Sequence, residues 1–326
     1  LISAGGGVFS RQAKAVPVNA EMAATLGIRE DHDSLTPDEL IQAALRAPVD
    51  LVWNGGIGTY VKASTEDHAA ADDRSNDSVR VDASELRCRV VVEGGNLGVT
   101  QRARIEFARG GGLINTDAID NSAGVGCSDH EVNLKVLLDA AARSGDLTTK
   151  QRGELLASMA DEVCDRVLAA NVAQNIALSS AESQAPGMIE PNRRLLAWLE
   201  ENVGLDRPLE SLPDDTELGE LRARGLGLTR PELSVLLAYA KNSLVPQLID
   251  SDLPSDPAFD HHLQAYFPPA IVERFPELVQ SHPLRGPLVS TLVVNDIVDR
   301  GGLSMVHRLI AETSATAVDI VRAFEA

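Results

Sequence analysis

Three short segments rich in glycine, asparagine and other small residues are the best candidates for ligand chemistry in this sequence. They are Asn54-Gly55-Gly56, Gly94-Gly95-Asn96 and Asn121-Ser122-Ala123-Gly124. Glycine allows a flat ring or a ribose to approach the backbone, and an asparagine side chain both donates and accepts hydrogen bonds, as a carboxamide or a sugar hydroxyl requires. Because Gly and Asn also make ordinary tight turns, one such segment alone is ambiguous. Their recurrence favours a binding face.

The residues before these segments are predicted to form buried strands. Residues 49–53 and 89–92 are short, apolar and rich in β-branched side chains, and a further short strand is expected at 113–115. Thr100 can cap a helix that runs to about Arg109, so strand, helix and strand follow one another as in a parallel sheet. Ligands of open α/β sheets bind beyond the carboxyl ends of the strands. The three segments are therefore expected at one edge of the sheet.

The rest of the chain has helical periodicity and contains helix-start signals. Thr36-Pro37-Asp38-Glu39 combines a capping Thr, a Pro at the first helical position and a Glu three residues later, which predicts a helix to about Arg46. Thr148 or Thr149 is expected to cap one long helix that reaches about Leu178, and another helix is expected from Ser304 to the end. We therefore predict an α/β, partial Rossmann-like domain at 1–150, followed by an all-α helical domain at 151–326.

Composition excludes several classes of protein. The formal net charge of −19 argues against a nucleic-acid or anionic-membrane binder, because both present negative surfaces. No apolar run has the length of a membrane span, and the N-terminus shows no secretory signal. Cys88, Cys127 and Cys164 are an odd and sparse set without metal-ligand spacing, which indicates reduced thiols in a cytoplasmic protein.

Ser128 is a candidate for binding a carboxylate. It follows the third segment and is expected to open a helix near Asp129, where its hydroxyl and the free helix amides could hold an anion. An ordinary helix cap is the competing interpretation, and the two roles are compatible.

Other polar residues are expected to carry no chemistry. His261 and His262 are adjacent, so their side chains should point apart on a regular element, and no metal site is predicted. His68 lies in a polar, acidic segment and is expected to be solvated. The same expectation holds for Lys62 and Lys135, because neither lies in a glycine-rich turn.

Longer stretches around the three segments resemble the large bacterial NAD-specific glutamate dehydrogenases. The stretches are Asp50–Tyr60, Val92–Gly98, Asn115–Val125, Cys127–Asn133, Leu228–Lys241, Ser281–Arg285 and Leu292–Val298. The resemblance covers nearly the whole chain. It implies a cofactor, NAD, and a reaction, the oxidative deamination of L-glutamate to 2-oxoglutarate and ammonia.

The shorter glutamate dehydrogenases share a more distant version of two stretches. Residues 93–96 are similar to their E-G-A-N, and residues 121–125 to their N-A-G-G-V. The likeness implies that Asn96 contacts the nicotinamide ribose, that Asn121 lies on the nicotinamide side of the cofactor, and that Ser128 binds the side-chain carboxylate of glutamate.

The same likeness implies a role for the glycines and indicates which motifs of the family this sequence does not contain. Gly94 and Gly95 would allow close backbone approach to the cofactor, and residues 54–56 would replace a Pro-Ala-Ala-like turn on the cofactor side. The pyrophosphate turn, the acidic ribose-binding position and the catalytic Lys and Asp of the family lie upstream of any matching residue. We therefore expect no catalytic residue here, and a fragment that is inactive without the remainder of the same enzyme chain.

Two other functions remain open from the residues alone. One is a different nucleotide-binding enzyme, such as a transferase, that uses the same sheet edge. The other is a non-catalytic regulatory or assembly module, which the long helical tail would suit. The full-length enzyme is expected to be a homo-oligomer.

Overall fold

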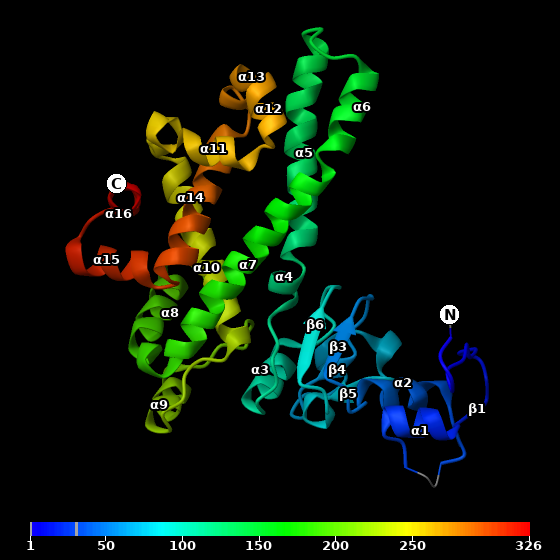
Figure 1. The fold of residues 1–326 in the computed structure, drawn as a ribbon. Coiled ribbons are helices and arrows are strands. Elements are labelled where there is room, and N and C mark those ends of the chain that lie inside the picture. Colours follow the sequence, from blue (N-terminus) through cyan, green and yellow to red (C-terminus); the bar gives the residue numbers. More distant parts are fainter. Residues whose placement is uncertain (1, 30–31) are drawn as a thin grey trace. The chain divides into compact units, whose positions relative to one another are not determined.

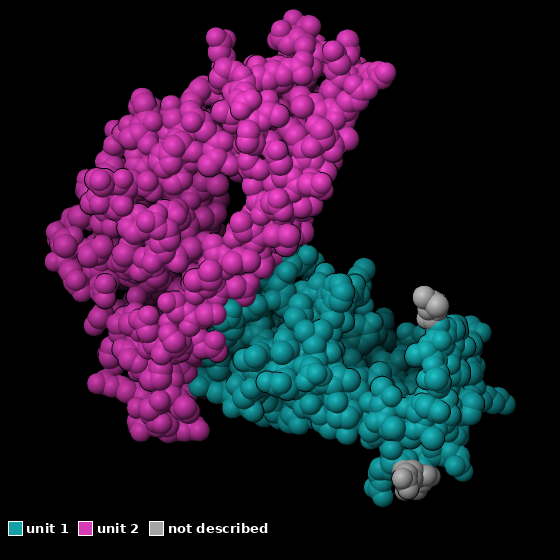
Figure 2. Space-filling model, viewed as in Figure 1, with its two compact units in different colours: residues 1–121, 229–231 teal, residues 122–228, 232–326 magenta. Residues whose placement is uncertain are grey.

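The computed structural model describes residues 2–29 and 32–326. The chain forms two compact units, which Figure 2 shows in different colours. Their residues are Leu1–Asn121 with Thr229–Pro231 for the first unit, and Ser122–Leu228 with Glu232–Ala326 for the second. Every strand of the described residues lies in the first unit. The α/β part followed by a helical part is confirmed, whereas domain limits at 1–150 and 151–326 stay a prediction.

Two parallel strands form the centre of the first unit (Figure 1). β3 (Leu51–Asn54) pairs with β6 (Val90–Glu93) in a register that sets Asn54 opposite Glu93. The two strands therefore end side by side, as expected. The remaining strands form two small pairs, namely β4 (Val61–Lys62) with β5 (Val81–Asp82), in parallel, and β1 (Val16–Pro17) with β2 (Ser34–Leu35), antiparallel.

The helices of the first unit begin where their caps predict. α2 (Pro37–Leu45) has a complete capping box at Thr36, and α3 (Gln101–Arg109) starts after Thr100, whose hydroxyl accepts the Ala103 amide. α1 (Ala20–Leu26) is capped in the same way by Asn19. A core beneath β6 and α3 contains Val61, Val81, Val91, Val99, Ala103, Phe107 and Ile114.

The third expected strand and its loop are not formed as predicted. Leu113 makes only an isolated bridge to Val90. The chain then turns into the short helix α4 (Asp117–Asp120), and α5 (Ser122–Arg143) begins after Asn121. Residues 122–124 are thus the first turn of a helix rather than a loop. The aspartates of α4 favour this outcome, because acidic side chains stabilise the first turn of a helix.

The second unit consists of helices of very different length (Figure 1). α5 and α7 pack along each other, and α14 contacts α7, α11 and α15. After α5, the helices are α6 (Thr149–Ser158), α7 (Ala160–Gln184), α8 (Ile189–Val203), α9 (Asp215–Ala223), α10 (Arg230–Ile249), α11 (Asp260–Tyr266), α12 (Pro269–Arg274), α13 (Pro276–Gln280), α14 (Arg285–Gly301), α15 (Met305–Thr313) and α16 (Ala317–Glu325). Within the described ranges, no helix is both long enough and apolar enough to cross a lipid bilayer.

Two predicted long helices are broken. Thr148 caps a helix as expected, but that helix ends at Ser158, and Met159 turns inward to be almost fully buried before α7 begins. The helix expected from Ser304 to the end stops at Ser314, whose φ of +61° is left-handed. Neither break is marked by Gly or Pro, so the sequence pattern shows no interruption there.

Candidate functional site

The loops that follow β3 and β6 are interlocked. The Asn54 carbonyl accepts hydrogen bonds from the amides of Gly94 (2.8 Å) and Gly95 (3.3 Å). A Cβ on Gly95 would lie 2.4 Å from the Gly56 carbonyl oxygen, and a Cβ on Gly94 would lie 2.7 Å from Nε1 of Trp53. Glycine is therefore needed at position 95 for contact between the two loops, whatever ligand they hold, whereas a side chain at position 94 would have to displace the exposed Trp53 side chain.

Gly55 and Gly56 differ from these glycines because their Cα atoms face open space. A Cβ on either residue would meet nothing within 4 Å, and both residues are exposed. The Asn54 side chain turns away from this opening: its Oδ1 accepts the Gly56 amide at 3.3 Å, and its Nδ2 is so close to Gly98 that no Cβ fits there. The Nδ2 is buried and has no hydrogen-bond partner among the described residues. The opening thus suits the close approach of a flat group to the backbone.

A buried ion pair stabilises the loop that follows β6, at residues 93–99. Glu93 ends β6 and is fully buried, and its carboxylate accepts Arg104 Nε at 2.7 Å and Nη2 at 2.9 Å. The amide of Val99 donates to the same carboxylate at 3.1 Å. Burial alone would lower the pKa of Arg104, but Glu93 and Asp117 raise it overall, so the guanidinium stays charged. The pair fixes both ends of the loop, at residues 93 and 99.

Carboxylates from α4 hold the backbone of the same loop. Asp120 accepts the amide of Glu93 at 2.8 Å, and Asp117 accepts the amide of Leu97 at 2.8 Å. Leu97 has a φ of +57°, which is unusual for a residue other than glycine. Burial raises the pKa of Asp120, against the hydrogen bonds of Asn115 and Glu93, which lower it. The strained tip of the loop is therefore held by side chains that follow it in the sequence.

The segment after the first loop supports the site from another direction. The hydroxyl of Thr59 donates to the Leu97 carbonyl at 2.7 Å. The buried Arg80 in turn donates to the Thr59 carbonyl at 2.8 Å and to Asp77 at 2.6 Å. His68, expected to be solvated, is half exposed and places Nδ1 3.0 Å from Nη1 of Arg80. The polar stretch 63–85 is thus ordered, and through Arg80 and Thr59 it stabilises the loop that follows β6.

The predicted site residues fall into two groups. The structure brings residues 54–56 and 94–96 together, and Asn96 is exposed at the tip of its loop. Asn121 is half-buried and directly follows Asp120, whose carboxylate contacts β6. Ser128 belongs to the second unit. It does not open a helix, because α5 already begins at Ser122, and it lies exposed within that helix.

Lys62 and Lys135, which were both expected to be solvated, lie in different environments. Lys62 is buried and pairs with Asp82, its cross-strand partner on β5. Lys135 is half exposed and pairs with Glu131 one helical turn away, at 2.5 Å. Burial of Lys62 in a two-residue strand gave no periodic signal in the sequence.

The positioning residues Arg104, Asp117 and Asp120 were not found by sequence reasoning. One usable signal exists for Arg104. It lies between Ala103 and Phe107 on the buried face of α3, and a charge on an apolar helix face needs a buried partner.

Two family models and several curated proteins match this chain. The family described as "Bacterial NAD-glutamate dehydrogenase, catalytic domain" matches residues 1–181, and "Glutamate dehydrogenase, C-terminal" matches residues 225–326. Three relatives are each named NAD-specific glutamate dehydrogenase. They are the proteins of Halomonas elongata (50% identical over 99% of this chain), Pseudomonas aeruginosa (48% over 99%) and Mycobacterium tuberculosis (44% over 100%).

The chain spans 20% of the length of each of these curated relatives. The match to the catalytic-domain family nevertheless covers more than half of the chain, and it includes both interlocked loops. The chain therefore belongs to the bacterial NAD-glutamate dehydrogenase family.

Proposed function

We propose that this chain is part of an NAD-dependent glutamate dehydrogenase and forms the nicotinamide-side wall of its cofactor site. The observation that carries the proposal is the pair of interlocked loops, whose open backbone at Gly55 and Gly56 stands next to a loop fixed by the Glu93–Arg104 pair. A rigid wall suits this reaction, because the protein contributes orientation while the cofactor carries the hydride chemistry. The names of the relatives support the same activity.

The residues would divide the work as follows. Asn96 would bind the nicotinamide ribose, Asn121 would bind on the nicotinamide side, and residues 54–56 would lie against the cofactor with their backbone. Ser128 would bind the side-chain carboxylate of L-glutamate. When bound, the nicotinamide supplies the hydride acceptor. The groups that polarise the substrate and position water would come from the rest of a longer chain. This chain alone would therefore not catalyse the reaction.

A Rossmann-like sheet completed by that longer chain is part of the proposal. Among the described residues, β3 pairs only with β6. Trp53 on β3 is 71% exposed and Leu51 is half exposed, which is unusual for apolar side chains on a central parallel strand. Further strands and helices would cover them. A cytoplasmic location, a homo-oligomeric state and a role in amino-acid catabolism belong to the same proposal.

Gly55→Ala in the full-length enzyme tests the cofactor wall. The new methyl group meets no protein atom within 4 Å, so folding should be unaffected. A flat group lying against this backbone would be pushed away, and we expect KM for NAD to rise by about tenfold or more, equivalent to about 1.4 kcal/mol, with a smaller change in KM for glutamate. Gly153→Ala is the matched control, because its Cβ also meets nothing and it lies in α6.

The activity itself is tested by NADH formation. The full-length enzyme should reduce NAD with L-glutamate, and Asn121→Ala should impair this reaction. A folded full-length protein that shows no glutamate-dependent reduction of NAD would contradict the proposed enzyme activity and favour a regulatory or assembly module. An unchanged KM for NAD in Gly55→Ala would contradict only the placement of the cofactor.

A further inference from the structure

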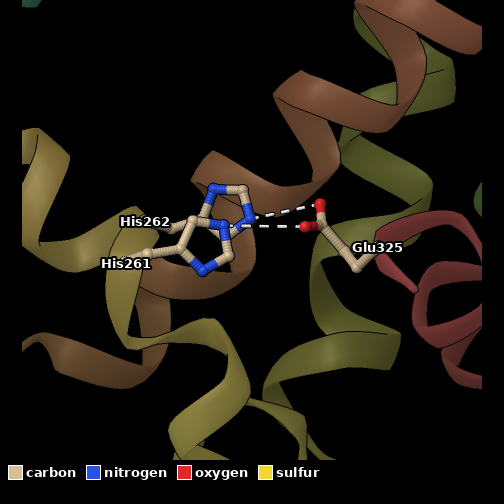
Figure 3. Close-up of side chains that lie close together, drawn as sticks. All are labelled: His261, His262 and Glu325. Atoms are coloured by element: carbon tan, nitrogen blue, oxygen red, sulfur yellow. Dashed lines mark hydrogen bonds and ion pairs between the residues drawn. The ribbon is translucent and has the colours of Figure 1, made fainter.

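His261, His262 and Glu325 bring three potential metal-ligand atoms together in the second unit (Figure 3). Nε2 of His261 lies 3.6 Å from Oε2 of Glu325, and Nε2 of His262 lies 3.2 Å from Oε1. All three ligand atoms lie within 4.8 Å of one another. The expectation that the adjacent histidines point apart is wrong, because both rings turn toward α16 and their centroids are 4.1 Å apart.

We propose that these three side chains bind one divalent cation of the zinc class, which joins α11 to α16. Zinc–nitrogen and zinc–oxygen bonds of about 2.0–2.1 Å in a tetrahedral site set ligand atoms about 3.4 Å apart. The distance of 3.6 Å from His261 Nε2 to Oε2 of Glu325 and that of 3.2 Å from His262 Nε2 to Oε1 are close to this spacing, but they involve the two different oxygens of the carboxylate. Side-chain rotation would bring the three ligand atoms, which lie within 4.8 Å of one another, to this spacing, and a water molecule would complete the four ligands.

The hydrogen bond of His261 leaves Nε2 as the ring nitrogen that can take a metal ion. Its Nδ1 lies 2.9 Å from the carbonyl oxygen of Ala258, which can only accept, so Nδ1 carries the hydrogen. In the neutral ring, Nε2 then presents a lone pair to the Glu325 carboxylate, which is also an acceptor. A metal ion between the two groups would satisfy both acceptors, as would a proton on Nε2, and Zn²⁺ titration distinguishes the two. A backbone carbonyl on the second ring nitrogen is also the usual orienting contact of a metal-bound histidine.

The other two ligands are held in place before any ion binds. The side chain of His262 is 12% exposed and stacks on Phe259, with an interplanar angle of 16°. The side chain of Glu325 is 18% exposed. The His261 side chain, at 58%, is the exposed one, so an ion would reach the cluster from solvent on that side. Two partly buried ligands and one exposed ligand suit a site that loads without unfolding.

The nearest positive charge on α16 is already neutralised. Arg322 pairs with Asp252 at 3.1 Å and with Asp256. It therefore competes little with a cation for Glu325. Two imidazoles and one carboxylate favour Zn²⁺ and similar transition metals over Mg²⁺ or Ca²⁺, which prefer oxygen ligands.

Metal binding by the untagged 326-residue chain tests the proposal. Zn²⁺ is titrated in competition with a chelating dye, and Co²⁺ is used to report coordination through its visible absorption. We expect one Zn²⁺ per chain, a Co²⁺ spectrum typical of four ligands, and no competition by Mg²⁺. His261→Ala should weaken Zn²⁺ binding at least about tenfold and abolish the Co²⁺ signal. Because His261 is exposed, this variant should keep its fold.

Controls separate the cluster from other ligands. Glu325→Gln keeps the size of the side chain and removes the charge, and it should weaken Zn²⁺ binding as well, whereas Glu312→Gln on α15 and His68→Ala should not. Zn²⁺ should also slow amide hydrogen exchange in α16. Unchanged Zn²⁺ affinity in both His261→Ala and Glu325→Gln would overturn the proposal. Loss of binding only after alkylation of the three free cysteines would overturn it too.

Discussion

Acidification from pH 7 to pH 5 is expected to weaken the second unit through His307. This residue is 8% exposed, and its ring packs edge-on against Trp198, with centroids 4.5 Å apart. Nε2 lies 3.1 Å from the hydroxyl of Ser243, whose hydrogen is given to the Ala240 carbonyl, so Nε2 is the donor. Nδ1 is buried without a hydrogen-bond partner among the described residues. Burial lowers the pKa of His307 from 6.5 to about 4.

The sign and size of the effect follow from proton binding. In the unfolded chain the imidazole takes up a proton near pH 6.5, whereas in the folded chain it stays neutral until about pH 4. The unfolded state therefore binds more protons in this window, and the free energy of unfolding falls as the pH drops from 6.5 toward 4. Between pH 7 and pH 5 the loss is about 2 kcal/mol, since one pKa unit corresponds to about 1.4 kcal/mol.

His307→Gln isolates this contribution. The sequence has two tryptophans, Trp53 and Trp198, so a Trp53→Phe background leaves Trp198 as a fluorescent probe beside the mutated residue. Urea unfolding at pH 7 and pH 5 gives the pH-dependent loss for each protein. The protein with His307 should lose about 2 kcal/mol more than the Gln variant.

Other buried histidines contribute equally to both proteins and cancel in the difference. The half-exposed His68 provides the matched control, because His68→Gln should leave the pH-dependent loss at Trp198 unchanged. Equal losses with His and with Gln at position 307 would refute the reasoning.

Two further predictions concern stability in the first unit. Arg104→Met leaves the carboxylate of Glu93 buried without its partner, and it should lower the free energy of unfolding in urea titrations by about 3–5 kcal/mol. Arg104→Met combined with Glu93→Leu should recover much of this loss, and equal losses in the single and double variants would contradict the account. Thr36→Ala removes the capping box of α2 and should shift the urea midpoint by an amount equivalent to about 1 kcal/mol, while the exposed Thr65→Ala should not; a shift of the same size in both would show that the cap is not responsible.

Local signals in the sequence predicted local structure well. The caps at Thr36, Thr100 and Thr148 each start a helix, because the interaction involves residues only three positions apart. The β-branched runs before Asn54 and Glu93 form the paired strands, so the two loops that follow them lie side by side as predicted, while their role in binding stays a prediction.

Contacts between distant residues could not be predicted in this way. The carboxylates that hold the loop at residues 93–99 come from α4, and Arg80 acts on it through Thr59. Nothing in the composition of residues 63–85 distinguishes an ordered segment that contacts the loops from a solvated loop. Likewise, α6 ends before the buried Met159, and no local residue pattern marks this break.

The glycines show how the structure narrows the ligand hypothesis. From the sequence, all four glycines of the two segments are equal candidates for backbone approach to a cofactor. In the structure, Gly95 is already required by its contact with the Gly56 backbone, and a Cβ on Gly94 would displace the Trp53 side chain, so neither glycine by itself indicates a ligand. Gly55 and Gly56 have no such internal reason, because a Cβ on either meets nothing within 4 Å. An argument for a cofactor at this wall therefore depends on these two residues, and a substitution there reports on the ligand rather than on the fold.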